Sequence, residues 1–127
     1  MNGLHILAEF HDCRCAAALL FEAGALRHLC LDACHQAGLV VVAEAFHAFA
    51  TPQQAAGATG AVVLAESHLA IHTWPELWAV TLDLYVCNFS RDNRQAAETA
   101  YGLLHRAFCP GRTRRQDVLR GAPGTGA

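Results

Sequence analysis

The sequence lacks a run of apolar residues long enough to cross a membrane. It has 127 residues, of which 54% are hydrophobic, yet no run reaches the roughly 18–20 residues that a membrane-spanning helix needs. The first residues also lack the basic region and continuous apolar region of a secretory signal peptide. We therefore expect a cytoplasmic protein that does not enter a membrane, with its six cysteines as reduced thiols.

A strong charge of either sign is missing as well. The formal net charge is −2 with the histidines neutral, and charged residues make up 16% of the chain. Proteins that bind nucleic acid usually carry a basic surface, so we expect no nucleic-acid partner. A basic cluster near the C-terminus is interpreted as a solvated tail, and its members are Arg112, Arg114, Arg115 and Arg120.

Internal repeats and linkers are absent too, so residues 1–127 are expected to form a single domain around one core. Hydrophobic periodicity predicts strands at 4–11, 39–49, 61–65 and 79–87, and helices at 15–36 and 92–108. Strands joined without crossover helices pair antiparallel, and two helices cover only one face of a sheet. The predicted fold is therefore α+β, a two-layer α/β sandwich with an antiparallel sheet and two helices on one face.

Local signals predict where the helices and the last strand lie. Gly38 is a plausible stop for the first helix, and Asp92 and Gln95 have the spacing of a capping box at the start of the second. The segment 51–60 is rich in Pro and Gly and is predicted to be a loop. After residue 109 we expect a frayed end with a short strand near 117–119.

The second face of the predicted sheet carries polar side chains. A high apolar content in a small domain often means that another subunit covers one face. This face must therefore meet water, a partner or a substrate, and its predicted members are Glu9, His11, Asp83, Tyr85 and Cys87.

Polar residues follow the third predicted strand in the stretch "VVLAESHLAIHTWPE" at 62–76. A Ser–His–Asp triad around Ser67 is not supported, because no G-x-S-x-G elbow surrounds this serine. His68 points away from Ser67 on an extended chain, and His72 is five residues further on. From the residue types alone, Ser67 is better explained as a hydroxyl at the end of a strand.

This stretch closely resembles the signature of the prokaryotic S-adenosylmethionine decarboxylases. The segments "LHILAEFHDC" at 4–13, "FHAF" at 46–49 and "LDLYVC" at 82–87 extend the resemblance in the same order. It implies a proenzyme that cleaves itself when Ser67 attacks the carbonyl of Glu66. Residues 1–66 then form a β chain and residues 67–127 an α chain, whose Ser67 becomes a pyruvoyl group that forms a Schiff base with the substrate.

The resemblance also implies roles for other residues. His72 matches the base that removes the Cα proton of Ser67, Thr59 matches a hydroxyl that supports processing, and Cys87 matches the proton donor of the decarboxylation. A neutral imidazole suits the first role and a protonated thiol the last. The positions that match binding of S-adenosylmethionine are Phe49 (adenine stacking), Glu76 (ribose hydroxyls), Leu69 and Trp74 (pocket walls) and Glu9 (an acid on the first strand).

By the same resemblance, two processed protomers form a homodimer whose sheets pack together, and both protomers contribute to each active site near that interface. The pyruvoyl group serves as the electron sink, so neither pyridoxal phosphate nor a metal is expected. The product, decarboxylated S-adenosylmethionine, would donate aminopropyl groups for spermidine synthesis.

The chain departs from the family pattern at three places. Thr59 stands where the family commonly has the serine of G-V-S-G, the loop 51–56 is longer, and Leu77 and Trp78 replace a Tyr-Gly pair. Relatives of this fold decarboxylate other cationic amino acids, so ornithine and arginine stay open as alternative substrates. The presence of Phe49 and Glu76 favours S-adenosylmethionine.

Two readings without enzyme activity also stay open. Cys30, Cys34 and His35, or the pair Cys13 and Cys15 with a nearby histidine, would be ligands of a small zinc-binding domain. No second cysteine pair stands at zinc-ribbon spacing, which weakens this hypothesis. The other reading is an unprocessed partner subunit, against which the intact catalytic positions of the resemblance count.

Overall fold

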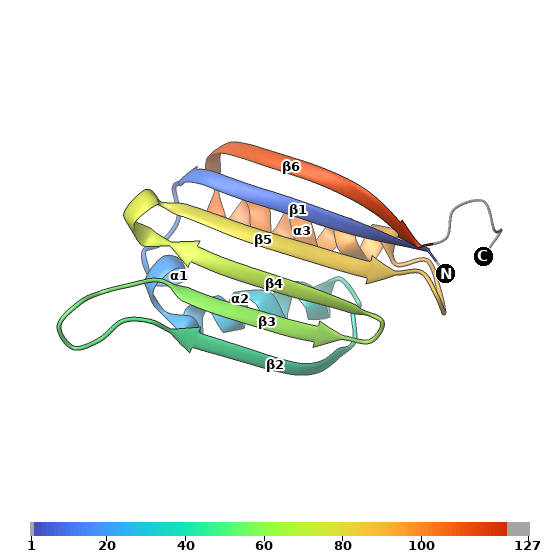
Figure 1. Cartoon of the computed structure of the whole chain (residues 1–127), viewed down its shortest axis with the longest axis horizontal. Coiled ribbons are helices and arrows are strands. Elements are labelled where there is room, and N and C mark those ends of the chain that lie inside the picture. Colours follow the sequence, from blue (N-terminus) through green and yellow to red (C-terminus); the bar gives the residue numbers. More distant parts are fainter. Residues whose placement is uncertain (1, 122–127) are drawn as a thin grey trace.

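The computed structural model describes residues 2–121 and shows one antiparallel sheet with helices on one side (Figure 1). The six strands are β1 (Asn2–Cys13), β2 (Val41–Ala48), β3 (Ala58–Leu64), β4 (Ser67–Trp74), β5 (Ala79–Cys87) and β6 (Pro110–Gly121). They lie in the order β2-β3-β4-β5-β1-β6, and each neighbouring pair is antiparallel. The predicted α+β architecture is confirmed.

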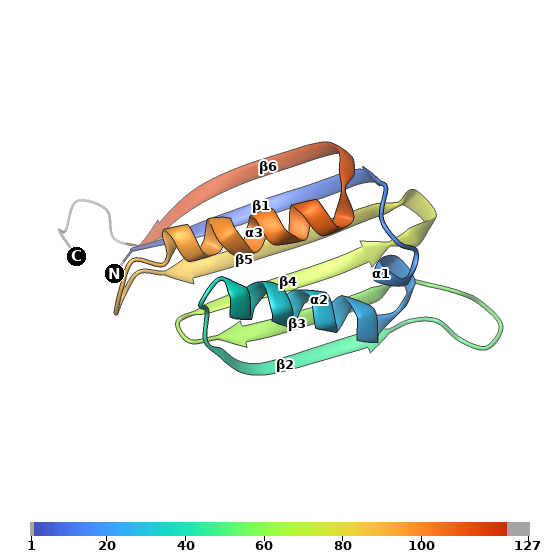
Figure 2. The same ribbon diagram turned by 180° about the vertical axis from the view of Figure 1, so that it is seen from behind.

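Figure 2 shows both main helices on the same face of the sheet. The helices are α1 (Ala18–Phe21), α2 (Ala23–Gln36) and α3 (Arg94–Phe108), and a short 3₁₀ turn, η1 (Pro75–Leu77), links β4 to β5. Helix α2 packs on β2 and β3, whereas α3 packs on β1 and β5. The helix predicted over 15–36 is interrupted at Glu22, whose backbone is extended with φ −115° and ψ 117°.

The core lies between the sheet and these helices. Strand β1 alternates as predicted, with Ile6 and Phe10 fully buried against the helices. Each such side chain contributes about 1.5–3 kcal/mol when it leaves water. The other large, fully buried side chains are Leu20, Leu26, Val62, Leu69, Ile71, Val80, Leu84, Val86, Leu104 and Phe108.

The helix ends agree with the sequence in one case and differ in the other. Gly38 follows α2 with φ +80°, the left-handed conformation that suits glycine at this position. The capping box predicted at 92–95 is wrong, because α3 begins at Arg94 after Asn93. Asp92 Oδ1 instead accepts a hydrogen bond from the amide of Arg94 over 3.0 Å, and the Gln95 side chain donates to Thr99 Oγ1 over 3.5 Å.

Two strands differ from the prediction. The segment 67–74 forms β4 in the middle of the sheet, where no strand was predicted. Residues 110–121 form the edge strand β6 rather than a solvated tail, and pair with β1 along its length. Arg115 points toward α3, where its Nη1 donates to Glu98 over 3.0 Å and its guanidinium lies 4.5 Å from the centre of the Tyr101 ring.

The face of the sheet opposite the helices is open, and no described helix covers it (Figure 1). It carries the predicted polar residues of β1 and β5, and it also exposes the large apolar side chains Leu7, Val63, Trp74 and Val118. Across residues 2–121, none of the helices has both the length and the apolar character needed to span a membrane.

Candidate active site

The bond that the resemblance predicts to break lies in a tight turn. Ala65 and Glu66 connect β3 to β4, and the flanking residues Leu64 and Ser67 face each other in the ladder. Glu66 has φ +66°, the left-handed conformation that is usual for glycine at such a turn. For another residue this conformation costs about 1–2 kcal/mol, so the backbone next to the Glu66–Ser67 bond is strained.

The hydroxyl of Ser67 has no competing partner. Ser67 is 8% exposed, and among the described residues its Oγ is a buried polar atom without a hydrogen-bond partner. It lies on the helix side of β4, the side of Leu69 and Ile71. Most buried hydroxyls are hydrogen-bonded, so an unpaired one beside a strained peptide bond fits a group that reacts with that bond.

Cys87 lies at the same end of the sheet as Ser67. Its neighbour Val86 pairs with Ser67, and Cys87 itself pairs with Gly3. The ring of Tyr85 lies against Gly3. A Cβ atom at position 3 would lie 2.9 Å from the Tyr85 hydroxyl. Glycine at position 3 therefore leaves room for a phenol beside the Cys87 thiol.

Tyr85 is partly buried and lies beside a charged group. Burial raises the pKa of Tyr85, and the adjacent Cys87 thiol adds to the rise. The guanidinium of Arg120, 4.8 Å from the ring centre, opposes it. Sequence reasoning assigned no role to Tyr85 or Arg120, because the pairing of β6 with β1 was not predicted.

The other predicted site residues gather at the opposite end of the sheet. Glu9, Thr81, His72 and Thr59 form one row across four strands of the open face. Thr59 Oγ1 lies 2.6 Å from His72 Nδ1, with donor and acceptor set by the imidazole tautomer. The structure therefore brings the predicted processing residues Thr59 and His72 into direct contact.

Aromatic and acidic side chains extend this row toward the sheet end. Trp74 Nε1 donates to Thr81 Oγ1 over 3.1 Å, and Glu76 is exposed in η1. Phe49, just after β2, is 56% exposed, and its ring lies 4.8 Å from that of His47. These rings and this carboxylate are free to contact a ligand.

A hollow of about 370 Å³ opens on this face. Its lining includes Glu9, His72, Asp83 and Arg114, and its volume is within the range of small-molecule sites. Arg114 was missed from the sequence because it was assigned to a tail. Once β6 is seen to pair with β1, its partner is Glu9 and both face the hollow.

Within one chain, the structure does not bring Ser67 and His72 together. The two residues lie five positions apart on β4, which corresponds to about 16 Å along a strand. Odd and even positions also point to opposite faces, so Ser67 faces the helices and His72 the open side. Leu69, predicted as a pocket wall, is fully buried in the core instead, because it shares the helix side of β4.

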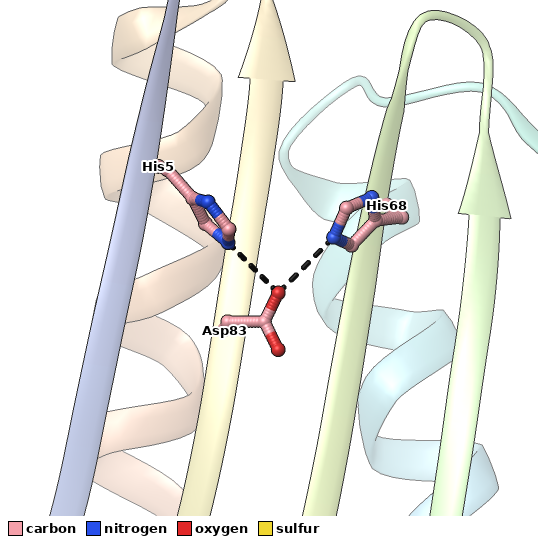
Figure 3. A group of neighbouring side chains, drawn as sticks. All are labelled: His5, His68 and Asp83. Atoms are coloured by element: carbon pink, nitrogen blue, oxygen red, sulfur yellow. Dashed lines mark hydrogen bonds and ion pairs between the residues drawn. The ribbon is translucent and has the colours of Figure 1, made fainter. Parts of the chain in front are cut away.

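Three polar side chains meet in the middle of the open face (Figure 3). His5 Nε2 and His68 Nε2 lie 2.9 and 3.0 Å from the same oxygen, Asp83 Oδ2. Two imidazoles and a carboxylate are groups that could hold a metal ion. The sequence contains one signal for this trio: all three residues occupy the alternating strand positions that face away from the helices.

The surroundings of this trio favour a hydrogen-bonded network over a metal centre. Arg120 Nη1 lies 3.4 Å from His5 Nδ1, and a guanidinium can only donate. His5 Nδ1 then accepts, which leaves the proton on Nε2 for Asp83. A metal-bound histidine has the reverse arrangement, with Nδ1 as the donor. The positive charge of Arg120 also disfavours a second cation nearby.

The zinc hypothesis for Cys30, Cys34 and His35 is wrong. Both cysteines are fully buried in the core side of α2, whereas His35 is exposed on the other side. Burial raises the pKa of the Cys34 thiol to about 11 and raises that of Cys30 as well. Neutral thiols that point away from the histidine do not form a metal site.

Comparisons with known proteins agree on one family. The family model for S-adenosylmethionine decarboxylase matches residues 4–121. An S-adenosylmethionine decarboxylase proenzyme from Syntrophomonas wolfei is 35% identical over 119 residues, which is 94% of this chain and 86% of that protein. One from Acetivibrio thermocellus is 44% identical over 85 residues, covering 67% of this chain and 64% of that protein.

A solved structure is similar over nearly the whole chain. The crystal structure of the adenosylmethionine decarboxylase from Aquifex aeolicus VF5 has a TM-score of 0.83 and is 31% identical. The match covers 98% of this chain and 95% of that one.

Proposed function

Since this chain belongs to the S-adenosylmethionine decarboxylase family, we propose that it is a self-processing decarboxylase that acts on S-adenosylmethionine through a pyruvoyl group made from Ser67. The observation that carries the proposal is the unpaired, buried Ser67 hydroxyl beside the left-handed Glu66. A residue kept in this state has no structural benefit, because it combines backbone strain with an unsatisfied polar group.

Self-processing follows from the chemistry of this turn. Ser67 Oγ bonds to the carbonyl carbon of Glu66, the peptide C–N bond breaks, and the hydroxyl proton moves to the freed nitrogen. A base then takes the Cα proton of Ser67, and the ester C–O bond breaks to release Glu66 as a carboxylate. Addition of water to the remaining residue and loss of ammonia leave a ketone at position 67.

Cys87 and the open face supply the groups that act in decarboxylation. The pyruvoyl group, once formed, provides a ketone that accepts the electrons left when carbon dioxide departs. Cys87 would deliver a proton to the substrate carbon; it lies at the same end of the sheet as Ser67, although its side chain is on the open face and that of Ser67 on the helix side. Neither a metal nor pyridoxal phosphate has a role in this scheme.

A homodimer accounts for the separation of Ser67 from His72. Two open faces that pack about a twofold axis, with their strands running in opposite directions, place the Ser67 end of one chain against the His72 end of the other. The exposed apolar side chains of this face, Leu7, Val63, Trp74 and Val118, would then be covered. His72 of one chain would take the Cα proton of its partner's Ser67 from the open face, whereas the Ser67 hydroxyl attacks Glu66 from the helix side of β4.

Substrate would bind at the end of the sheet that carries Phe49, Trp74 and Glu76. Phe49 and Trp74 offer exposed rings to the adenine and to the sulfonium cation, and Glu76 offers a carboxylate to the ribose hydroxyls. Glu9 adds negative charge in the adjacent hollow. Ornithine and arginine carry neither an adenine ring nor a sulfonium group, so they would not need the aromatic side chains at positions 49 and 74.

Release of carbon dioxide from carboxyl-labelled substrates tests this assignment. Purified chain is incubated separately with labelled S-adenosylmethionine, ornithine and arginine. We expect release from S-adenosylmethionine alone, because only this substrate fills the aromatic positions. Release from ornithine or arginine, with none from S-adenosylmethionine, would assign the other substrate class.

The hydroxyl of Thr59 provides a second test. Thr59→Val keeps the shape but removes the contact with His72 Nδ1, so self-cleavage should slow about tenfold, the effect of losing one short hydrogen bond. Thr59→Ser retains the hydroxyl and should cleave at least as fast as the wild type. The rate is measured from the two fragments on a denaturing gel, and equal rates for Thr59→Val and Thr59→Ser would refute this role.

A further inference from the structure

We propose that the loop 88–93, between β5 and α3, is a positioning element for self-cleavage because it holds the side chain of Glu66. This inference rests on the proposed function. The amide of Ser90 donates to Glu66 Oε2 over 3.3 Å, across 24 positions in the sequence. The turn that contains the cleaved bond is therefore tied by a side chain to a separate part of the fold.

The loop is itself held in place by several hydrogen bonds. The Asn93 amide donates to Asn88 Oδ1 over 2.8 Å, and Asn93 Nδ2 donates to the carbonyl of Cys87 over 2.9 Å. Arg91 Nη2 donates to the carbonyl of Gly38 over 2.7 Å. Because Asn93 is also buried, the Ser90 amide occupies a defined position relative to the sheet.

The anchor matters because Glu66 is in an unfavourable backbone conformation, with φ +66°. An unanchored two-residue turn can relax by rotating the Glu66 peptide, and this rotation would move the carbonyl carbon away from Ser67 Oγ. A carboxylate fixed by the Ser90 amide resists that rotation. The loop thus acts through Glu66 and takes part in no proton transfer.

The same loop also holds the strand that carries the proposed proton donor. Asn93 Nδ2 binds the Cys87 carbonyl, one residue before the loop begins. In the proposed reaction, the group made from Ser67 and the thiol of Cys87 act on the same part of the substrate. A loop that contacts both Glu66 and Cys87 helps to fix their relative positions. Phe89, in the middle of the loop, is 76% exposed and makes none of these hydrogen bonds.

A matched pair of variants at residue 66 tests the anchor. Glu66→Ala removes the acceptor and should slow self-cleavage about tenfold or more, whereas Glu66→Gln keeps an acceptor oxygen and should stay within about threefold of the wild type. Phe89→Ala, in the same loop, should cleave at the wild-type rate. Cleavage is followed on denaturing gels, and thermal unfolding midpoints of the three variants should stay within about 2 °C of each other.

The donor side of the bond is tested at Ser90. Ser90→Pro removes the amide proton and should slow cleavage as much as Glu66→Ala, and the double variant should be no slower than either single one. If Ser90→Pro does not fold, the comparison of Glu66→Ala with Glu66→Gln is sufficient to test the inference. If the wild type cleaves, either of two results would overturn this inference: Glu66→Ala cleaves at the wild-type rate, or Glu66→Gln cleaves as slowly as Glu66→Ala. A wild-type chain that stays whole would overturn the proposed function together with it.

Discussion

Ser67→Ala should leave the chain whole and without decarboxylase activity. The wild type is expected to give two fragments on a denaturing gel, residues 1–66 and 67–127, because the Ser67 hydroxyl attacks the Glu66 carbonyl. Alanine offers no nucleophile and no precursor of the ketone, so activity should fall by at least about 10⁴-fold. The measurement combines the gel with intact mass and a carbonyl reagent, which should label the wild-type fragment 67–127 only.

The fold of this variant should be unchanged. Within residues 2–121 the Ser67 hydroxyl has no hydrogen-bond partner, so its removal breaks none of the described hydrogen bonds and should not lower the free energy of unfolding. Cleavage of Ser67→Ala at the wild-type position would show that another group attacks the bond. An intact wild type without a reactive carbonyl would instead favour the reading as an unprocessed partner subunit.

Co-expression of two inactive chains should restore activity. Ser67→Ala lacks the nucleophile and His72→Ala lacks the processing base, and each should be inactive as its own dimer. In a mixed dimer, Ser67 of one chain meets His72 of the other, so one of the two sites is complete. With one complete site of two, a purified mixed dimer should show about half of the wild-type activity. The measurement is the release of labelled carbon dioxide from purified mixed dimers.

A second pair of variants serves as the control. Ser67 and Cys87 lie at the same end of the sheet, so Ser67→Ala combined with Cys87→Ala should show no recovery, because neither site of the mixed dimer holds both groups. Recovery in this control, or none in the Ser67→Ala and His72→Ala pair, would mean that the site is not shared between chains as proposed.

Much of the fold can be predicted from local sequence patterns, such as the spacing of apolar residues and the position of a glycine. The alternation of Leu4, Ile6 and Phe10 with polar residues predicts β1 and its buried side, and Gly38 marks the end of α2. These predictions hold because the preference of a residue for burial, or for a particular backbone conformation, depends on its own type and its nearest neighbours in the sequence. The predicted antiparallel sheet, with both main helices on one face, was confirmed for the same reason.

Strand β4 was not predicted, and β6 was predicted only as a short strand near 117–119, because the stability of both strands comes from their neighbours. In β4, His68 and His72 alternate with buried Leu69 and Ile71, but the third strand was predicted to end at 65 and no element was assigned to the polar residues after it. In β6, few side chains are buried, and pairing with β1 supplies the hydrogen bonds. An edge strand rich in arginine carries little hydrophobic signal, so its register, and with it the place of Arg114, needed the assembled sheet.

The amino-acid order by itself determined the family, the serine proposed for cleavage and the alternating faces of β1 and β5, because motif identity and period-two burial are local properties. Only the tertiary structure decided that Ser67 is buried after a left-handed Glu66, with no hydrogen-bond partner for its hydroxyl in the described part of the chain. It also decided that His72 lies far along the same strand on the other face, since distance between residues depends on how the chain between them is folded. That separation is the physical reason to place half of each site on a second chain.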